Sequence, residues 1–250
     1  MSYKEFNPSE KLQHIIDKYW FSDSSETESI SRVFPDCSMD ILFNLGNSYF
    51  SKSHFKNNEI VLTGMMTNFS DVYLNKGCRI FGVRFKPLGL NLFINFDFNA
   101  IKNDTVKINE IFPDYWAESF KNIFSFTAIE DIINNFEDNI IRILTSNKRT
   151  LDQDVQLIIS NISKYNDFSV QHAIKNVYTT QRQLEIKFKK EIGISIKEFI
   201  NINRFIRIKE EIKTSKFSLA EIAVENGYYD SSHFCKEIKK YTGYTAKKLK

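Results

Sequence analysis

GYYDSSHFCKEIKKYTGYT, residues 227–245, is the stretch that decides the fold of the carboxy-terminal part of the chain. If it forms a helix with 3.6 residues per turn, Phe234, Ile238 and Tyr241 lie on one side. The opposite side carries the polar and basic residues Ser232, Lys236, Lys239 and Lys240. The pattern therefore predicts a helix that packs through one face and exposes the other. A basic outer face is either solvated surface or a contact for a polyanion, and the rest of the sequence has to distinguish the two.

Length and composition predict a globular protein of two domains. The 250 residues are enough for two separate cores, and 42% of them are hydrophobic and 26% charged. No run approaches the roughly 18 to 20 apolar residues of a membrane span, and the amino terminus lacks the pattern of a secretory signal. We therefore expect a cytoplasmic protein without a membrane-spanning segment.

Charge is distributed unevenly along the chain. Residues 1–150 carry a net charge of −3, whereas residues 151–250 carry a net charge of +6. A basic carboxy-terminal part is typical of a module that binds a polyanion such as DNA.

Motifs for catalysis or metal binding do not occur in the sequence. The four histidines are scattered, no His or Cys spacing is typical of a metal site, and no glycine-rich loop suits a phosphate group. The cysteines Cys37, Cys78 and Cys235 are expected to be reduced thiols. We therefore expect no catalytic residues, no metal and no other cofactor, and we do not expect an enzyme.

Short strand patterns alternate with turn signals in the amino-terminal part. They are SMDILFNLG (38–46), NSYFS (47–51), EIVLTGMM (59–66), DVYLN (71–75) and RIFGVRFK (79–86). These segments predict a β-rich, sheet or barrel-like domain, with helices following after Pro87. Arg84 lies in the last strand and faces either solvent or the interior, where it would hold an anionic effector.

Residues 126–146 predict a long amphipathic helix. Its apolar stripe consists of Ile129, Ile132, Ile133, Phe136, Ile140, Ile141 and Leu144. The stripe either packs on the sheet of its own domain or meets the same helix of a second chain, which would give a homodimer through 126–146.

An internal repeat organises the last hundred residues. A shift of 50 residues aligns Ala173 with Ala223, Thr180 with Asp230, Leu184 with Phe234, Phe188 with Ile238, Gly193 with Gly243 and Ser195 with Thr245. Capping boxes or similar signals mark helix starts at Thr180, Ser195 and Ser218. Each repeat unit is thus a short helix, a turn and a second helix with a basic outer face. This is the helix-turn-helix arrangement, in which the second helix enters the major groove of DNA.

The helix between the two units, from Ser195 to Thr214, sets their separation. About nineteen residues at 1.5 Å each give a length of roughly 28 Å. Successive major grooves on one face of B-DNA are about 34 Å apart. One polypeptide would therefore place two recognition helices in adjacent major-groove segments, and a DNA contact becomes a better explanation of the basic faces than solvation.

The second unit, SLAEIAVENGYYDSSHFCKEIKKYTGYT, resembles the signature of the AraC/XylS family of bacterial transcription regulators. The resemblance is carried by Ile222, Ala223, Gly227, Tyr228, Asp230, Ser232, His233, Phe234, Lys239, Lys240, Gly243 and Thr245, and extends over about residues 155–250. The sequence departs from the family pattern at Lys236, Ile238 and Ala246, and in the first unit at Val177 and Ile186.

The amino-terminal half resembles a sensor-type domain found fused to such modules. PDCSMDILFNLG (35–46) and FGVRFKPLGLNLF (81–93) are similar to its recurring segments, and the fusion implies a cupin-like or mixed β-barrel. The expected division is therefore an effector-binding or dimerisation domain (1–146), a linker (147–154) and an AraC-type DNA-binding domain (155–250). The fold class is α+β, with an all-α second domain of two helix-turn-helix units joined by a long helix.

The expected function is that of a sequence-specific DNA-binding transcription regulator. The residues expected to contact DNA are Thr180, Arg182, Ile186, Lys189, Lys190, Ser232, His233, Lys236, Lys239 and Lys240, and Arg84 is the candidate effector-binding residue. Expected partners are double-stranded DNA, a small-molecule effector and RNA polymerase. The alternative is a ligand-binding barrel or an enzyme whose helical carboxy-terminal domain mediates protein contacts.

Overall fold

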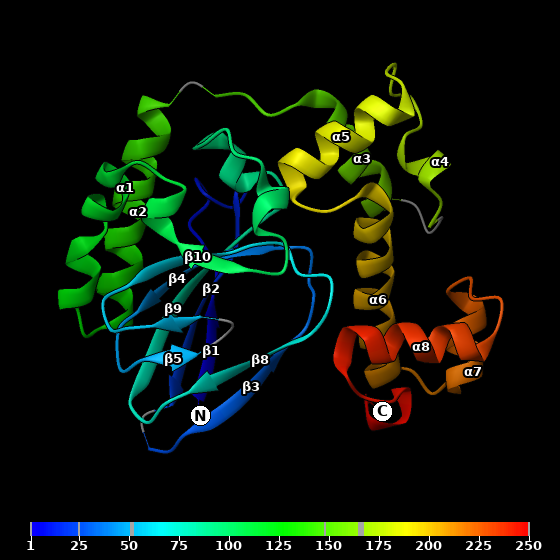
Figure 1. The fold of residues 1–250 in the computed structure, drawn as a ribbon, viewed down its shortest axis with the longest axis horizontal. Helices are drawn as coiled ribbons and strands as arrows, with labels where there is room; N and C mark the ends of the chain where they lie inside the picture. Colours follow the sequence, from blue (N-terminus) through cyan, green and yellow to red (C-terminus); the bar gives the residue numbers. More distant parts are fainter. Residues whose placement is uncertain (1, 25, 51–52, 148, 165–167, 250) are drawn as a thin grey trace.

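The strands and helices divide along the chain as the sequence predicts. The computed structural model describes residues 2–24, 26–50, 53–147, 149–164 and 168–249. All strands lie in the first part of the chain, and everything after residue 129 that has regular structure is helical. Figure 1 shows a sheet-rich body on one side and, on the other, a group of helices arranged around the upright helix α6.

A six-stranded antiparallel sheet forms the centre of the amino-terminal part. In spatial order its strands are β1 (Ser2–Phe6), β2 (Ile16–Ser24), β9 (Cys78–Phe85), β4 (Met39–Asn44), β7 (Ile60–Thr63) and β10 (Thr105–Lys107). In the central register Phe81 of β9 lies between Phe21 of β2 and Phe43 of β4. Because side chains alternate along a strand, these three rings share one face of the sheet.

A second sheet of four strands faces the other side of the first. Its order is β3 (Ser29–Val33), β8 (Ser70–Leu74), β5 (Tyr49–Phe50) and β6 (His54–Phe55). A small apolar cluster joins the two sheets, with Leu42 and Ile80 from the first and Tyr49 and Leu74 from the second. The expected fold class is confirmed with one correction: the pairing seen in the described residues leaves both sheets open, so neither closes into a barrel. They close over each other by side-chain packing, as in a sandwich, and not by hydrogen bonds around a ring.

Helices cover the opposite face of the larger sheet. Helix α2 (Ile129–Ser146) places the ring of Phe136 about 6 Å from the rings of Tyr19, Phe43 and Phe81. Ile132, Phe136 and Ile140 are completely buried. Of the two alternatives for the apolar stripe, the structure shows packing on the chain's own sheet.

Short segments connect β9 to α2 and complete this core. They are η1 (Gly89–Leu92), η2 (Phe98–Ile101), η3 (Ile108–Glu110), α1 (Asp114–Ser119) and η4 (Lys121–Ser125). Trp116 of α1 is buried and packs against Phe93, Phe112 and Phe120.

Seven helices form the carboxy-terminal part within the described residues. They are α3 (Gln153–Lys164), α4 (Val170–Ala173), α5 (Gln181–Ile192), α6 (Ile196–Thr214), α7 (Leu219–Glu225), α8 (Ser231–Thr242) and α9 (Ala246–Leu249). Ser195 and Ser218 form the predicted capping boxes with Glu198 and Glu221. Because α3 starts at Gln153, the last two residues of the expected linker 147–154 belong to a helix. None of the helices that the structure describes is long and apolar enough to cross a membrane.

Candidate DNA-binding surface and ligand cavity

The helices α5 and α8 begin where side chains satisfy their first backbone amides. The Thr180 hydroxyl accepts a hydrogen bond from the Gln183 amide, and the Asp230 carboxylate accepts one from the His233 amide at 2.7 Å. Both helices end at a glycine with positive φ, Gly193 and Gly243. The repeat inferred from the sequence thus corresponds to two structurally equivalent helices.

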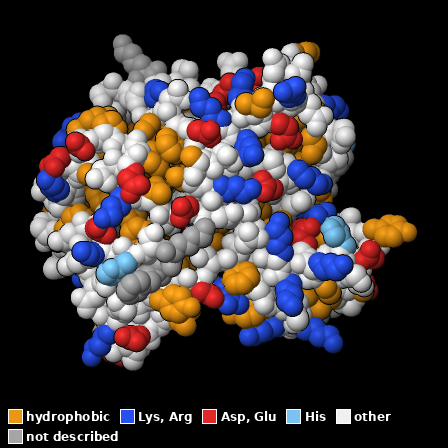
Figure 2. Space-filling view, viewed as in Figure 1, with side chains coloured by type: hydrophobic (Ala, Val, Ile, Leu, Met, Phe, Trp, Pro, Cys, Tyr) orange, Lys and Arg blue, Asp and Glu red, His pale blue; other side chains and the backbone are white. Residues whose placement is uncertain are grey.

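The predicted DNA-contacting residues all lie on the outer faces of these helices or at their starts. The side chains of Thr180, Arg182, Ile186, Lys189, Lys190, Ser232, His233, Lys236, Lys239 and Lys240 are all exposed. Leu184 and Phe188 on the inner side of α5, like Phe234 and Ile238 of α8, are buried. In Figure 2 basic side chains gather over the part of the surface occupied by α8. Ile186 is unusual because an isoleucine on this surface is 63% exposed.

A buried ion pair fixes α8 to the long helix α6. Arg204 Nη2 lies 2.9 Å from Glu237 Oε2, and both side chains are more than nine-tenths buried. The other carboxylate oxygen accepts a hydrogen bond from the Tyr228 hydroxyl at 2.8 Å, and the Arg204 guanidinium lies 4.2 Å from the centre of the Tyr228 ring. The orientation of α8 is therefore set by a charged network inside the carboxy-terminal part.

The first unit has an ion pair at the equivalent place with the charges exchanged. Lys187 of α5 lies 2.9 Å from Asp152 and 3.0 Å from Asp154, at the start of α3. The 50-residue shift aligns Lys187 with Glu237 and Asp154 with Arg204. These ion pairs were not predicted from the sequence, although opposite charges at repeat-related positions indicate them.

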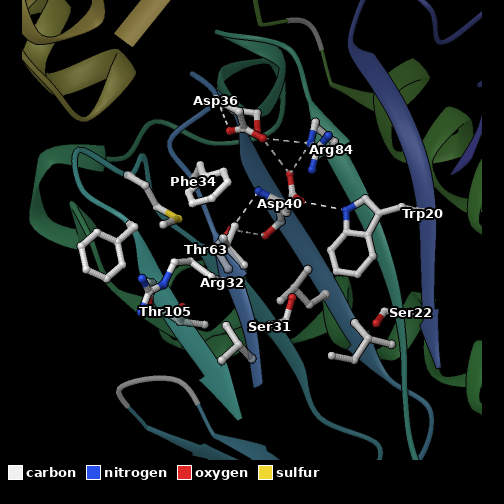
Figure 3. Close-up of a pocket in the computed structure, with 18 of the residues that line it drawn as sticks. Trp20, Ser22, Ser31, Arg32, Phe34, Asp36, Asp40, Thr63, Arg84 and Thr105 are labelled. Atoms are coloured by element: carbon white, nitrogen blue, oxygen red, sulfur yellow. Dashed lines mark hydrogen bonds and ion pairs between the residues drawn. The ribbon is translucent and has the colours of Figure 1, made fainter. Parts of the chain in front are cut away.

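A cavity of about 520 Å³ lies between the two sheets of the amino-terminal part. Its apolar wall includes Leu42, Val72, Leu74, Ile80, Met66 and Phe69. Figure 3 shows Asp36, Asp40 and Arg84 close together at one end of the cavity, here called the Arg84 end, while Ser22 and Ser31 lie toward the other, the Ser22 end. A cavity of this size, mostly apolar with a few polar groups, is suited to a small organic molecule.

Arg84 faces this cavity, which was one of the two orientations left open by its sequence. Its Nε atom lies 3.3 Å from Asp36 Oδ2 and 3.5 Å from Asp40 Oδ1, and Nη1 lies 3.9 Å from Glu5 Oε1. Burial raises the pKa of Asp40 to about 6, although the nearby Arg84 opposes this shift. Three carboxylates thus already surround Arg84, and little of its positive charge is left for a ligand.

Trp20 forms the floor beside this cluster. The indole Nε1 donates a hydrogen bond to Asp40 Oδ2 at 2.8 Å. The ring lies flat on Gly82, where a Cβ atom would come within 2.0 Å of the indole. Glycine at this position therefore permits the tryptophan to lie against the sheet.

Among the described residues of the carboxy-terminal helices, Lys209 of α6 lines the cavity. Its Nζ lies 5.8 Å from the centre of the Phe34 ring, and no ion pair to it is found within the part of the chain described. Burial and the neighbouring Lys213 ammonium lower the pKa of Lys209. Lys209 is thus a partly desolvated cation with no ion pair among the described residues. Its role was not predictable from the sequence, because its position depends on how α6 packs against the amino-terminal part.

A second contact between the two parts, the Arg32 clamp, consists of Arg32, Phe69, Asp71, Thr242 and Tyr244. The guanidinium of Arg32 makes two hydrogen bonds of 2.7 Å to Asp71 and donates a third, at 3.4 Å, to the carbonyl oxygen of Thr242 at the end of α8. It lies between the rings of Phe69 and Tyr244, 4.4 and 4.7 Å from their centres. Arg32 and Phe69 also line the cavity. The clamp therefore joins the cavity wall to the end of α8.

The first unit also contacts the amino-terminal part. Lys102 Nζ lies 2.5 Å from Glu198 Oε1, the carboxylate that caps α6. Gly193, at the end of α5, lies so close to Phe98 that a Cβ atom would be 3.0 Å from its carbonyl oxygen. The carboxy-terminal ends of α5 and α8 are thus both in contact with the part of the chain that contains the cavity.

No group of three or more His, Cys, Asp or Glu side chains is placed to hold a metal ion, as far as the described residues extend.

Comparison with protein families gives a match in the amino-terminal part of the chain and another in the carboxy-terminal part. Residues 174–250 match the model of a helix-turn-helix domain, and residues 4–107 match a domain of unknown function, DUF6597. No curated protein matches the chain.

Solved structures with a similar arrangement have low sequence identity. ToxT from Vibrio cholerae O395 bound to (E)-4-(8-methylnaphthalen-1-yl)but-3-enoic acid is 15% identical, with a TM-score of 0.49 over 92% of this chain and 98% of that one. Unsaturated fatty acid bound ToxT from strain SCE256 is 16% identical, with a TM-score of 0.47 over 92% and 94%. The AraC-like transcriptional activator CuxR is 8% identical, with a TM-score of 0.28 over 99% and 82%.

Proposed function

Because residues 174–250 form a helix-turn-helix domain of the AraC type, we propose that this chain is a sequence-specific DNA-binding transcription regulator controlled by a small-molecule effector. The observation that carries the DNA-binding function is the pair of capped helices α5 and α8, which expose basic faces at the two ends of α6. At 19 residues α6 is roughly 28 Å long, close to the spacing of about 34 Å between adjacent major grooves.

The exposed residues divide into two groups by their position on the helices. Lys189, Lys190, Lys239 and Lys240 lie in the last turns and would neutralise phosphates. The residues nearer the helix starts would reach base edges in the major groove. Affinity would then come mainly from the first group and sequence preference from the second.

The DNA-binding function is tested by fluorescence anisotropy with labelled duplexes from the region upstream of the chain's own gene. The wild type should bind with an affinity that falls steeply with salt concentration. Lys239→Ala/Lys240→Ala should weaken binding to specific and unrelated duplexes alike and reduce the salt slope by about two units, one for each lysine. Lys11→Ala/Lys56→Ala, which removes two exposed lysines of the other domain, is the matched control.

If the double variant of α8 binds as tightly as the control, with unchanged circular dichroism, this face does not contact DNA. If the wild type binds no duplex at any salt concentration, the alternative of a ligand-binding protein with a helical interaction module is favoured.

The cavity supports the effector part of the proposal. Its wall is mainly apolar, and it is faced by Lys209, which forms no ion pair with any of the residues that the structure describes. An amphipathic molecule with an anionic group beside Lys209 and an apolar body between the sheets would match both features. Because Lys209 belongs to α6, the same contact would connect ligand binding to the helix that carries the two recognition helices.

Other partners and the location of the protein are part of the proposal. A dimer through residues 126–146 would have to use the outer side of α2, since its apolar stripe packs on the chain's own sheet. Contact with RNA polymerase and a cytoplasmic location follow from a role in transcription. Light scattering, with and without duplex DNA, measures the oligomeric state and tests the proposed dimer.

A further inference from the structure

Two hydroxyl groups in the cavity lining are buried without a hydrogen-bond partner among the residues that the structure describes. The oxygen atoms of Ser22 and Tyr49 are shielded from solvent, and neither has an acceptor or donor within the described residues. The two side chains are 6% and 2% exposed, and both line the cavity between the sheets. Buried hydroxyl groups are normally paired, so each such group calls for an explanation.

The neighbouring serine of the same strand shows that the fold can satisfy a buried hydroxyl at this sheet face. Ser24 lies two residues after Ser22 on β2, and its side chain therefore points to the same side. The Ser24 hydroxyl donates a hydrogen bond to the Thr27 carbonyl oxygen at 2.6 Å and lies 3.1 Å from the Ser29 hydroxyl. Ser22, which borders the cavity, has no such partner in the described part of the chain. The unpaired group is therefore associated with the cavity and not with the strand.

Ser22 and Tyr49 lie far from the charged end of the cavity. Ser22 is the cross-strand neighbour of Ile80, four residues before Arg84 on β9, which corresponds to roughly 13 Å along the strand. Tyr49 packs in the same apolar cluster as Ile80. Lys209, in contrast, has Asp36 and Arg84 among its charged neighbours. A ligand that reaches from Lys209 to Ser22 would be elongated, with its two ends in different surroundings.

We propose that Ser22 and Tyr49 form a polar subsite at the Ser22 end that donates hydrogen bonds to a hydroxyl or carbonyl oxygen of the effector. The inference rests on the proposed effector function and narrows the ligand class. The molecule is anionic at one end, apolar in the middle and oxygen-substituted at the other end. An unsubstituted acyl chain would leave both hydroxyl groups without partners, which lowers its affinity relative to an oxygen-bearing analogue of the same length.

The test uses two probes that differ by one group, decanoic acid and its ω-hydroxy derivative. Their dissociation constants are measured by isothermal titration calorimetry on the full chain. The wild type should bind the ω-hydroxy acid about 3- to 10-fold more tightly than decanoic acid. Ser22→Ala/Tyr49→Phe should abolish this preference while it leaves the affinity for decanoic acid nearly unchanged. Ser31→Ala, which removes a partly exposed hydroxyl of the same cavity, should retain the preference.

Each of the other outcomes contradicts one part of the proposal. Equal affinities of the wild type for the two acids, or a preference that persists in the double variant, would mean that the two hydroxyl groups do not contact the ligand. Binding of both acids that Lys209→Gln does not weaken would contradict the proposed position of the anionic group. If neither acid binds to the folded wild type, the proposed effector class fails, and the polar subsite fails with it.

Discussion

Glu237→Leu should destabilise the helix-turn-helix part by about 3 to 5 kcal/mol, because it leaves the buried Arg204 guanidinium without a counter-charge. The structure places the effect at the upper end of this range. The Tyr228 hydroxyl, which donates to the other Glu237 oxygen, loses its acceptor in the same step. Stabilities of whole domains are about 5 to 15 kcal/mol, so this one change removes a large fraction of the total.

The double variant Arg204→Met/Glu237→Leu should recover most of the loss, since a buried ion pair replaced by apolar groups of similar volume is close to neutral. Glu210→Leu is the matched control. It breaks the ion pair between Glu210 and Lys213 of α6, at 3.1 Å, but both side chains are more than half exposed. An exposed pair of this kind contributes about 0 to 1 kcal/mol.

Urea unfolding followed by far-ultraviolet circular dichroism measures the three variants, since the helices that they affect dominate this signal. Similar losses for Glu237→Leu and Glu210→Leu would refute the importance of burial. A double variant no more stable than Glu237→Leu would show that Arg204 stabilises α8 by packing on Tyr228 and not through its charge.

Three further predictions concern other parts of the molecule. Asp40→Asn should gain stability relative to the wild type as the pH rises from about 4 to 7. Burial raises the pKa of Asp40 to about 6, so above that pH only the wild type buries a charge at this position. A difference between the urea midpoints of the two proteins that stays constant across this pH range contradicts the assignment. Ile186→Arg should change the preferred base in one half of the DNA site from T to G, with a change in the free energy of discrimination of about 1 to 3 kcal/mol. A selection from randomised duplexes that returns the wild-type site would mean that Ile186 does not contact the bases. Gly243→Ala should lower the melting temperature more than Gly227→Ala. Both glycines have φ near 70°, but only at Gly243 would a Cβ atom lie 2.7 Å from Arg32. Equal shifts in melting temperature would mean that the Arg32 clamp rearranges without loss of stability.

Local signals in the sequence were sufficient to predict the carboxy-terminal helices. Helix starts at Thr180, Ser195 and Ser218 depend on side chains within three residues of the amide they satisfy, so a short stretch of sequence contains the information. The inner and outer faces of α5 and α8 follow from helical periodicity in the same way. The prediction for these helices is therefore confirmed in start, end and orientation.

The amino-terminal part depends on contacts that are distant in sequence, and the prediction was less complete there. The strand β2 was missed because charged residues interrupt the apolar pattern of IDKYWFSDS, and its partner β9 lies some sixty residues later. The strands β4, β5, β7, β8 and β9 carry denser β-branched and aromatic patterns and were predicted. The open sandwich could not be distinguished from a barrel, because closure depends on the pairing of edge strands.

The cavity residues show the same limit. The orientation of Arg84 was one of two alternatives, and the sequence could not show that Asp36, Asp40 and Glu5 would surround it. Lys209 occupies an ordinary position in an amphipathic helix. Its contact with the cavity follows only from the packing of α6 against the amino-terminal part.

The length of α6 has a consequence for how binding sites can diverge. Both recognition helices are attached to one continuous helix, so the insertion of a single residue within it would rotate α8 by about 100° around the helix axis relative to α5. Gradual changes in spacing are therefore not accessible to this protein by small insertions, in contrast to two domains joined by a flexible segment. Operators in different genomes should differ in base sequence while the distance between their two half-sites stays constant.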